Sequence, residues 1–121
     1  MKAVQLAMAT FLAVSSVQAQ APNALEGRWV VDLSVNPAEP YTKSMQLRLG
    51  ADGSVTGSFY DSEIQAGRWK VDRGRTCVSF RTTDGAGSYH TSACLRGTTV
   101  EGQTWAEHRS FLFNWIATRA P

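Results

Sequence analysis

Apolar and polar residues alternate along most of the chain after Trp29, and turn-forming residues recur roughly every ten positions. Successive side chains of a β-strand point to opposite faces, so this alternation predicts strands with one apolar face each. No segment after Trp29 keeps the period of an amphipathic helix for about ten residues. The pattern predicts eight consecutive antiparallel strands, at residues 27–33, 43–49, 55–60, 64–71, 75–82, 88–96, 99–106 and 111–119.

The turns between these strands set the register of the pairing. A three-residue turn within 50–54 aligns Leu49 with Val55, and the later turns continue the same alternation. One segment breaks the pattern, because Gly67 and Trp69 do not point inward if Ile64 does. Either a β-bulge near Gln65 or an error in the assumed register explains this. The residues expected to point inward are Trp29, Val31, Leu33, Met45, Leu47, Leu49, Val55, Phe59, Trp69, Val71, Val78, Phe80, Tyr89, Leu95, Val100, Phe111, Phe113 and Trp115.

Eight antiparallel strands leave two unpaired edges unless the first strand pairs with the last. About 100 residues follow the predicted leader, which is enough for one hydrophobic core. We therefore expect a single all-β domain over residues 20–121, an antiparallel eight-stranded up-and-down β-barrel. A two-sheet β-sandwich is the alternative. The long link at 34–42 is the candidate lid.

The first 19 residues have the three parts of a secretory signal peptide. Lys2 gives a positive start, residues 7–14 form a short apolar core, and Val17-Gln18-Ala19 has the small-x-small ending that signal peptidase cleaves. A transmembrane helix needs roughly 20 apolar residues, about twice the length of this core. We therefore expect cleavage after Ala19, a periplasmic or secreted product, and no membrane span after cleavage.

The chain contains two cysteines, Cys77 and Cys94. A turn at 85–86 brings them directly opposite each other on neighbouring strands, on the outward face. An exported protein meets an oxidising compartment, where such a pair forms a disulfide. The alternatives are a metal pair or a free nucleophilic thiol, but a structural metal usually needs four ligands and the chain has only two histidines. We expect a disulfide and no metal site.

The charges of the chain argue against nucleic acid as a partner. Twelve basic and ten acidic residues give a net charge of +2, and the longest basic cluster is the short run at 73–75. Catalysis has little support either. Residues 107–109 combine an acid, a base and a cation, but side chains in a hairpin turn diverge, and no nucleophile lies beside them. We expect neither enzymatic activity nor a cofactor.

Both ends of the predicted barrel domain carry residues typical of one group of barrels. Gly27-Arg28-Trp29 opens the first predicted strand, and Arg119 closes the last. This combination resembles the G-x-W motif and terminal arginine of the calycins, a group that includes lipocalins and avidins. The resemblance implies an eight-stranded barrel in which Arg119 packs across Trp29 at the closed end.

Three further segments are similar to the avidin and streptavidin type: residues 50–57, 66–69 and 90–93. The positions that hold biotin in that family differ here. Hydrogen-bonding residues of the first strand and loop fall on Val31 and Val35, and a tyrosine and a serine fall on Phe59 and Asp61. Only Thr91 keeps a hydroxyl of that site. A site without its buried hydrogen-bond partners loses orders of magnitude in affinity, so tight biotin binding is not expected.

The inner wall combines aromatic and apolar side chains with a few hydroxyl groups. An eight-stranded barrel can hold one small ligand, and inward-facing glycines such as Gly102 would leave room for it because they have no side chain. The alternative is that side chains fill the barrel completely. In a hollow barrel, a small, mostly apolar or aromatic ligand would contact Trp69, Tyr89, Thr91, Thr104, Phe113 and Trp115.

Four apolar residues are expected on the outer face of the barrel: Val30, Trp105, Leu112 and Ile116. Large exposed apolar patches usually mark an interface, so this face predicts a homo-oligomer or a protein partner. The alternative is a register slip that turns these residues inward. The patch supports a second hypothesis, a protein-interaction module such as an inhibitor of an exported hydrolase, or a structural oligomer, which rests on analogy between folds.

Overall fold

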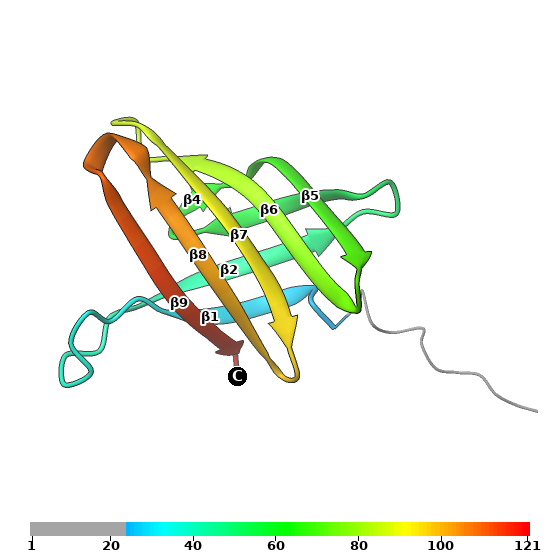
Figure 1. Ribbon diagram of the computed structural model, residues 1–121, viewed down its shortest axis with the longest axis horizontal. Helices are drawn as coiled ribbons and strands as arrows, with labels where there is room; N and C mark the ends of the chain where they lie inside the picture. Colours follow the sequence, from blue (N-terminus) through cyan, green and yellow to red (C-terminus); the bar gives the residue numbers. More distant parts are fainter. Residues whose placement is uncertain (1–23) are drawn as a thin grey trace, which may run out of the picture.

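The computed structural model describes residues 24–121, so the predicted signal peptide lies outside the described residues. The described chain consists of strands joined by turns, with one short 3-10 helix, η2 (Glu107–Arg109). The strands, shown in Figure 1, are β1 (Gly27–Asp32), β2 (Thr42–Leu49), β3 (Ser54–Phe59), β4 (Ser62–Glu63), β5 (Gln65–Asp72), β6 (Arg75–Thr83), β7 (Ser88–Arg96), β8 (Thr99–Ala106) and β9 (Phe111–Arg119). The eight long strands agree with the predicted ones to within one residue at each end. The short strand β4 was not predicted.

The strands form one closed barrel. Their order is β2-β1-β9-β8-β7-β6-β5-β3-β4, and an additional pairing of β2 with β3 closes the circle. The first and last strands are hydrogen-bonded, with Trp29 opposite Arg119. The prediction of an antiparallel eight-stranded up-and-down barrel is confirmed, with β4 as an extra strand, and the sandwich alternative is excluded.

The predicted hairpin registers are also found in the structure. Leu49 pairs with Val55 across the first of these turns. The expected bulge lies in β5, where the register shifts between Gln65 and Arg68 and Ala66 has a positive φ of 53°. A bulge adds one residue to one strand only, so apolar residues on both sides of it can face the same interior.

Strands β3 and β5 are paired over only part of their length. Near the start of β3, Val55 lies opposite Gly67 of β5. Near its end, β3 pairs with β4 instead, and Phe59 lies opposite Ser62. Strand β4 therefore replaces β5 in the wall at the end of the barrel where β3 finishes.

Apolar side chains occupy much of the interior, and the buried cluster comprises Leu25, Trp29, Val31, Leu33, Met45, Leu47, Val55, Phe59, Ile64, Val78, Phe80, Ala93, Val100, Trp115 and Ala117. The predicted burial of Val71 and Phe111 is wrong, because these side chains are 48% and 41% exposed. Strand β5 pairs with β3 only near Gly67, and β9 pairs with β1 only from Ile116 onward. Val71 and Phe111 therefore lack a neighbouring strand on their second side.

Cys77 and Cys94 form a disulfide, with a Cα–Cα distance of 4.0 Å. They lie directly opposite each other on β6 and β7, and their neighbours Val78 and Ala93 are buried. The bridge is therefore on the outer face of the wall. The disulfide prediction is confirmed, and the free-thiol and metal-pair alternatives are excluded. A disulfide is in keeping with an oxidising compartment.

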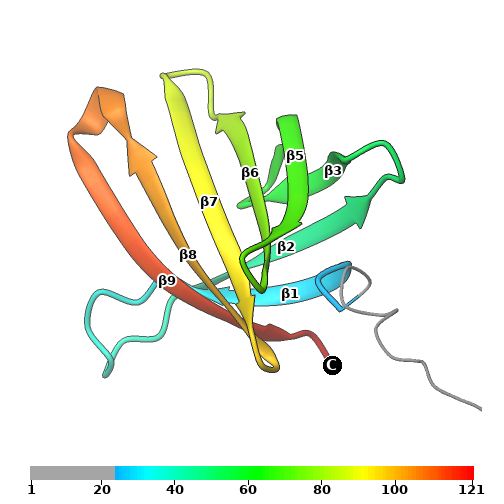
Figure 2. The same ribbon diagram turned by 45° about the vertical axis from the view of Figure 1, so that its right-hand side comes forward.

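The two ends of the barrel are built differently (Figure 2). The end that we call the closed end carries tight turns at residues 50–53, 73–74 and 97–98. The end that we call the open end carries longer connections at residues 33–41, 60–61, 84–87 and 107–110. In both ribbon views the cyan connection between β1 and β2 projects outward from the barrel wall.

Candidate ligand site at the open end

A cavity of about 120 Å³ lies inside the open end of the barrel. Its apolar lining consists of Leu33, Phe59 and Phe113. Its polar lining consists of Tyr60, Ser62, Thr82, Asp84, Tyr89, Thr104 and Arg109. An engineered protein cavity of about 150 Å³ binds benzene. The space at the open end is therefore suited to a single ring or a short chain.

The closed end is covered by side chains of the barrel itself. The guanidinium carbon of Arg119 lies 4.1 Å from the centre of the Trp29 ring, and its Nη1 donates to the Glu26 carbonyl at 2.6 Å. The indole Nε1 of Trp29 donates to the carbonyl of Leu25 at 2.9 Å, and Leu25 is fully buried. This is the arrangement that the calycin resemblance implies. A ligand would therefore enter from the open end.

The middle of the barrel is filled, and its hydroxyl groups are already paired. Thr91 and Thr104 share a hydrogen bond of 2.8 Å, and Nε1 of Trp115 donates to Oγ1 of Thr104 at 3.0 Å. The Trp115 ring packs against Phe59, with ring centres 5.4 Å apart. It also occupies the space next to Gly102, where a Cβ atom would lie 2.3 Å from the ring. The interior is therefore filled in the middle and hollow at the open end.

At the mouth of the cavity, Tyr89 joins two groups of opposite charge. Its hydroxyl donates to Oδ2 of Asp84 at 2.7 Å and accepts from Nη1 of Arg109 at 3.3 Å. The hydrogen bonds that Asp84 accepts from the Ala86 backbone N–H and from Tyr89 lower the pKa of its carboxyl group. The bond to Tyr89 raises the pKa of Arg109. Both groups are therefore charged at neutral pH.

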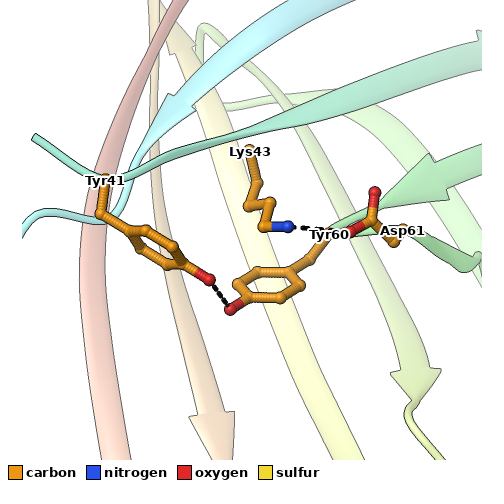
Figure 3. Close-up of polar contacts among 4 residues, drawn as sticks. All are labelled: Tyr41, Lys43, Tyr60 and Asp61. Carbon is orange, nitrogen blue, oxygen red and sulfur yellow. Dashed lines mark hydrogen bonds and ion pairs between the residues drawn. The ribbon is translucent and has the colours of Figure 1, made fainter.

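A second polar cluster connects residues 33–41 to the wall of the cavity (Figure 3). The hydroxyl groups of Tyr41 and Tyr60 are hydrogen-bonded, which raises the pKa of Tyr60, and Nζ of Lys43 lies 2.9 Å from Oδ2 of Asp61. The hydrogen bond to Asp61 raises the pKa of Lys43. Tyr60 and Asp61 have φ angles of 54° and 66°, which are uncommon for residues other than glycine. The two contacts therefore support a strained turn at the cavity wall.

The connection between β1 and β2 does not form the expected lid. Only Leu33, at its start, lines the cavity, and none of residues 34–41 does so. Its ends are held by a backbone hydrogen bond of 2.9 Å from Leu33 to Tyr41. The contact with the cavity wall is made by the Tyr41 side chain through Tyr60.

Three of the six residues predicted to bind a ligand line the cavity: Tyr89, Thr104 and Phe113. Thr91 and Trp115 lie below it, in the filled middle of the barrel. The structure does not bring Trp69 to the cavity. Its indole Nε1 donates to the Gly50 carbonyl at 2.8 Å, which places it at the closed end. The bulge in β5 separates this residue from the end of the wall that surrounds the cavity.

Much of the polar lining was not predicted from the sequence. Thr82 continues the two-residue period of the inward residues of β6, so the alternation could have identified it. Tyr60, Asp84 and Arg109 lie outside the strands, where alternation does not determine the direction of a side chain. Arg109 is exposed, as expected for its turn, and it also hydrogen-bonds the Tyr89 hydroxyl, a contact that the sequence did not predict.

The four outer apolar residues lie on the outer face, but they do not form one continuous patch. Trp105, Leu112 and Ile116 are 41%, 48% and 51% exposed, and Val30 is half-buried. Trp105 pairs directly with Leu112. The next outward pair toward Ile116 is polar, since Nε2 of Gln103 donates to Oδ1 of Asn114 at 2.8 Å. This register excludes the predicted alternative of a slip that turns these residues inward.

Within residues 24–121, no group of three or more histidine, cysteine or acidic side chains is placed to hold a metal ion. No helix in that part of the chain is long and apolar enough to cross a membrane. Comparison of the sequence and structure with protein-family models, curated proteins and solved structures found no match. The closed antiparallel barrel is compatible with a calycin, and the likeness to that group remains a resemblance.

Proposed function

We propose that this chain is exported to the periplasm or secreted, and that it binds a small, mostly apolar or aromatic ligand in the open end of the barrel without catalysing a reaction. The observation that carries the proposal is the cavity at that end, with Phe59 and Phe113 in its apolar lining. Small-molecule sites are typically concave and mostly apolar, with a few polar groups that orient the ligand. In this barrel the apolar side chains of Leu33, Phe59 and Phe113 lie beside hydroxyl, carboxylate and guanidinium groups that could orient a ligand.

Aromatic side chains in the lining favour an aromatic ligand. Phe59 packs against Phe80 and Trp115 with ring centres 5.5 and 5.4 Å apart, so its position in the wall is held by the core. Phe113 is half-buried and contacts Phe111, with ring centres 4.5 Å apart. A ring inserted beside these side chains would bury apolar surface and make edge or offset contacts, both of which are favourable.

Native mass spectrometry of protein exported with its own leader and purified without denaturation is the first test. We expect a mature chain that begins at Gln20, a mass two hydrogens below that of the reduced chain, and a fraction with additional mass that is lost on denaturation. A leader retained on the exported chain would contradict the export proposal. A preparation without additional mass is then tested for binding by titration.

NMR titration with indole tests the cavity directly. We expect chemical-shift changes confined to the residues that line the cavity, and about tenfold weaker binding in the Phe113→Ala variant because apolar contact surface is removed. Leu112→Ala is the matched control, since Leu112 is the preceding residue of β9 and points outward. The proposal is wrong if indole shifts no residue at the open end, or if the two variants weaken binding equally.

The exposed side chains on the outer face favour a second candidate function, a protein-interaction module or a structural oligomer. Trp105 and Leu112 are adjacent and more than two-fifths exposed. Exposed aromatic residues are common at protein interfaces. Sedimentation velocity measurements on the purified chain should show an oligomer that Trp105→Ala converts to a monomer. A monomer at all concentrations would leave only a separate protein partner, such as an exported hydrolase, for this face.

A further inference from the structure

The cavity combines an apolar interior with one cationic side chain at its mouth. Arg109 lies on η2 and lines the cavity together with Phe113. Within residues 24–121, the ion pairs that the structure contains do not include Arg109. Its Nη1 donates a hydrogen bond of 3.3 Å to the Tyr89 hydroxyl. A guanidinium group has five N–H donors, so most of its donors are open to a ligand.

Asp84, the acidic residue at the mouth, already has hydrogen-bond partners for both of its carboxylate oxygens. Oδ1 of Asp84 accepts from the Ala86 N–H at 2.9 Å, and Oδ2 accepts from the Tyr89 hydroxyl at 2.7 Å. Both oxygens of Asp84 therefore have partners within the protein. The Tyr89 hydroxyl donates its single proton to Asp84, so it can only accept from Arg109 or from a ligand.

A second cation near the open end, Lys43, is already paired with an acid. Nζ of Lys43 forms an ion pair with Asp61 at 2.9 Å and lies 5.0 Å from the centre of the Tyr60 ring. Lys43 does not line the cavity, whereas Arg109 does. Asp84 keeps its negative charge in the same lining, but both of its oxygens already accept hydrogen bonds. The open N–H donors of Arg109 are therefore the charged group that a ligand can bind, and their planar arrangement suits a carboxylate.

We propose that the ligand is a small organic anion, an aryl or short-chain carboxylate, whose carboxylate binds Arg109 and whose apolar body lies against Phe59 and Phe113. This inference rests on the proposed function, because it assigns the ligand class of the same cavity. The volume of about 120 Å³ favours a single ring with a short substituent over a long acyl chain. A cationic ligand would lie beside the guanidinium group and would have to compete with the Ala86 N–H and the Tyr89 hydroxyl for the oxygens of Asp84.

Benzoate and benzamide form a matched pair of probes, since they have nearly the same shape and differ in charge. We expect benzoate to bind the exported, oxidised protein about tenfold more tightly than benzamide at pH 7, as measured by NMR titration, because hydrogen bonds to charged groups are stronger than neutral ones. In Arg109→Gln the preference should disappear through weaker benzoate binding, with benzamide affinity unchanged within about twofold. The Arg109→Lys variant should retain part of the preference for benzoate over benzamide.

Arg75→Gln is the control for net charge. Arg75 begins β6 beside the 73–74 turn of the closed end and is exposed, so its replacement removes one positive charge far from the cavity. This variant should keep the full preference for benzoate. Loss of the preference in both variants would show a long-range charge effect and overturn the proposal, as would equal binding of the two probes to the unaltered protein.

Indole separates failure of this inference from failure of the proposed function. If indole shifts the residues of the cavity while benzoate does not bind there, the proposed function stands and the assignment of an anionic ligand is wrong. If indole, benzoate and benzamide all leave the open end unchanged, both proposals are wrong. Circular dichroism spectra and thermal unfolding of Arg109→Gln check that an altered preference does not reflect a damaged fold.

Discussion

Both ends of the barrel place an arginine against an aromatic side chain, but the two arginines differ in their other contacts. At the closed end, Arg119 lies over Trp29 and donates to two backbone carbonyls near the start of the described chain. At the open end, Arg109 donates to the Tyr89 hydroxyl and takes part in no ion pair within residues 24–121. The first arginine binds the protein itself, and the second has donors available for another molecule.

The aromatic side chains show the same contrast. Trp29 is 1% exposed and belongs to the hydrophobic core, whereas Phe113 is half-buried and lines the cavity. Full burial of a large side chain stabilises a fold, and partial burial beside a cavity leaves contact surface for a ligand. Similar residue types therefore stabilise the barrel at one end and form a candidate site at the other. Substitutions should separate the two effects.

The largest expected effect is the loss of the closed-end tryptophan. Trp29→Ala should lower the free energy of unfolding by about 3–5 kcal/mol, because it removes a fully buried ring from the core. Urea unfolding followed by circular dichroism measures this change. Trp105→Ala is the control, since this tryptophan is 41% exposed on the outer face. If both variants lower the free energy of unfolding equally, the prediction that the buried tryptophan contributes more to stability is wrong.

The disulfide on the wall should contribute the next largest effect. Cys77 and Cys94 are 17 residues apart in sequence, and closing a loop of this size stabilises a fold by about 3 kcal/mol in the chain-entropy account. The double variant Cys77→Ala with Cys94→Ala should lose about that much in urea unfolding at neutral pH, while indole still shifts the residues at the open end. Reduction of the unaltered protein should have the same effect. A reduced protein as stable as the oxidised one would contradict the prediction.

The two arginines should differ in the same measurement, although by less. Arg119→Gln should lower the free energy of unfolding by about 1–2 kcal/mol, because it removes the stacking on Trp29 and weakens hydrogen bonds to backbone carbonyls. Arg109→Gln should leave stability unchanged within error and alter ligand preference instead. Equal losses of stability in the two variants would remove the distinction between the ends.

The smallest expected effect is on the pH dependence of the free energy of unfolding, through Asp84 at the open end. The pKa of Asp84 is lowered from 3.8 by hydrogen bonds to the Ala86 N–H and to Tyr89. A carboxyl group with a lowered pKa in the folded state contributes stability that is present above its unfolded value and is lost as the pH falls through the folded value. Asp84→Asn should therefore flatten the fall in stability below a pH of about 3.8. Urea unfolding across the acidic range measures this, with unchanged curves as the contradicting result.

The hairpin registers could be read from the sequence because each depends on a short turn and on alternation beside it. The pairing of Cys77 with Cys94 was obtained in this way and is found in the structure. The broken alternation around Gln65 indicated a bulge or a register error, and the structure contains the bulge. The exposure of Val71 and Phe111 could not be predicted, because it depends on the length over which β3 pairs with β5 and β1 pairs with β9. Alternation gives the face of a strand to which a side chain points, and it does not show whether another strand covers it.

By itself, the sequence determined the number of long strands, their order, the closure of the barrel and the disulfide, because these follow from local turn chemistry and the need to pair every edge. Only the tertiary structure decided where the interior is filled and where it is hollow. The Trp115 ring occupies the space beside Gly102, and Arg109 meets Tyr89 across 20 residues of sequence. Such contacts join segments that are distant along the chain, and the turn residues among them take directions that no periodic pattern specifies.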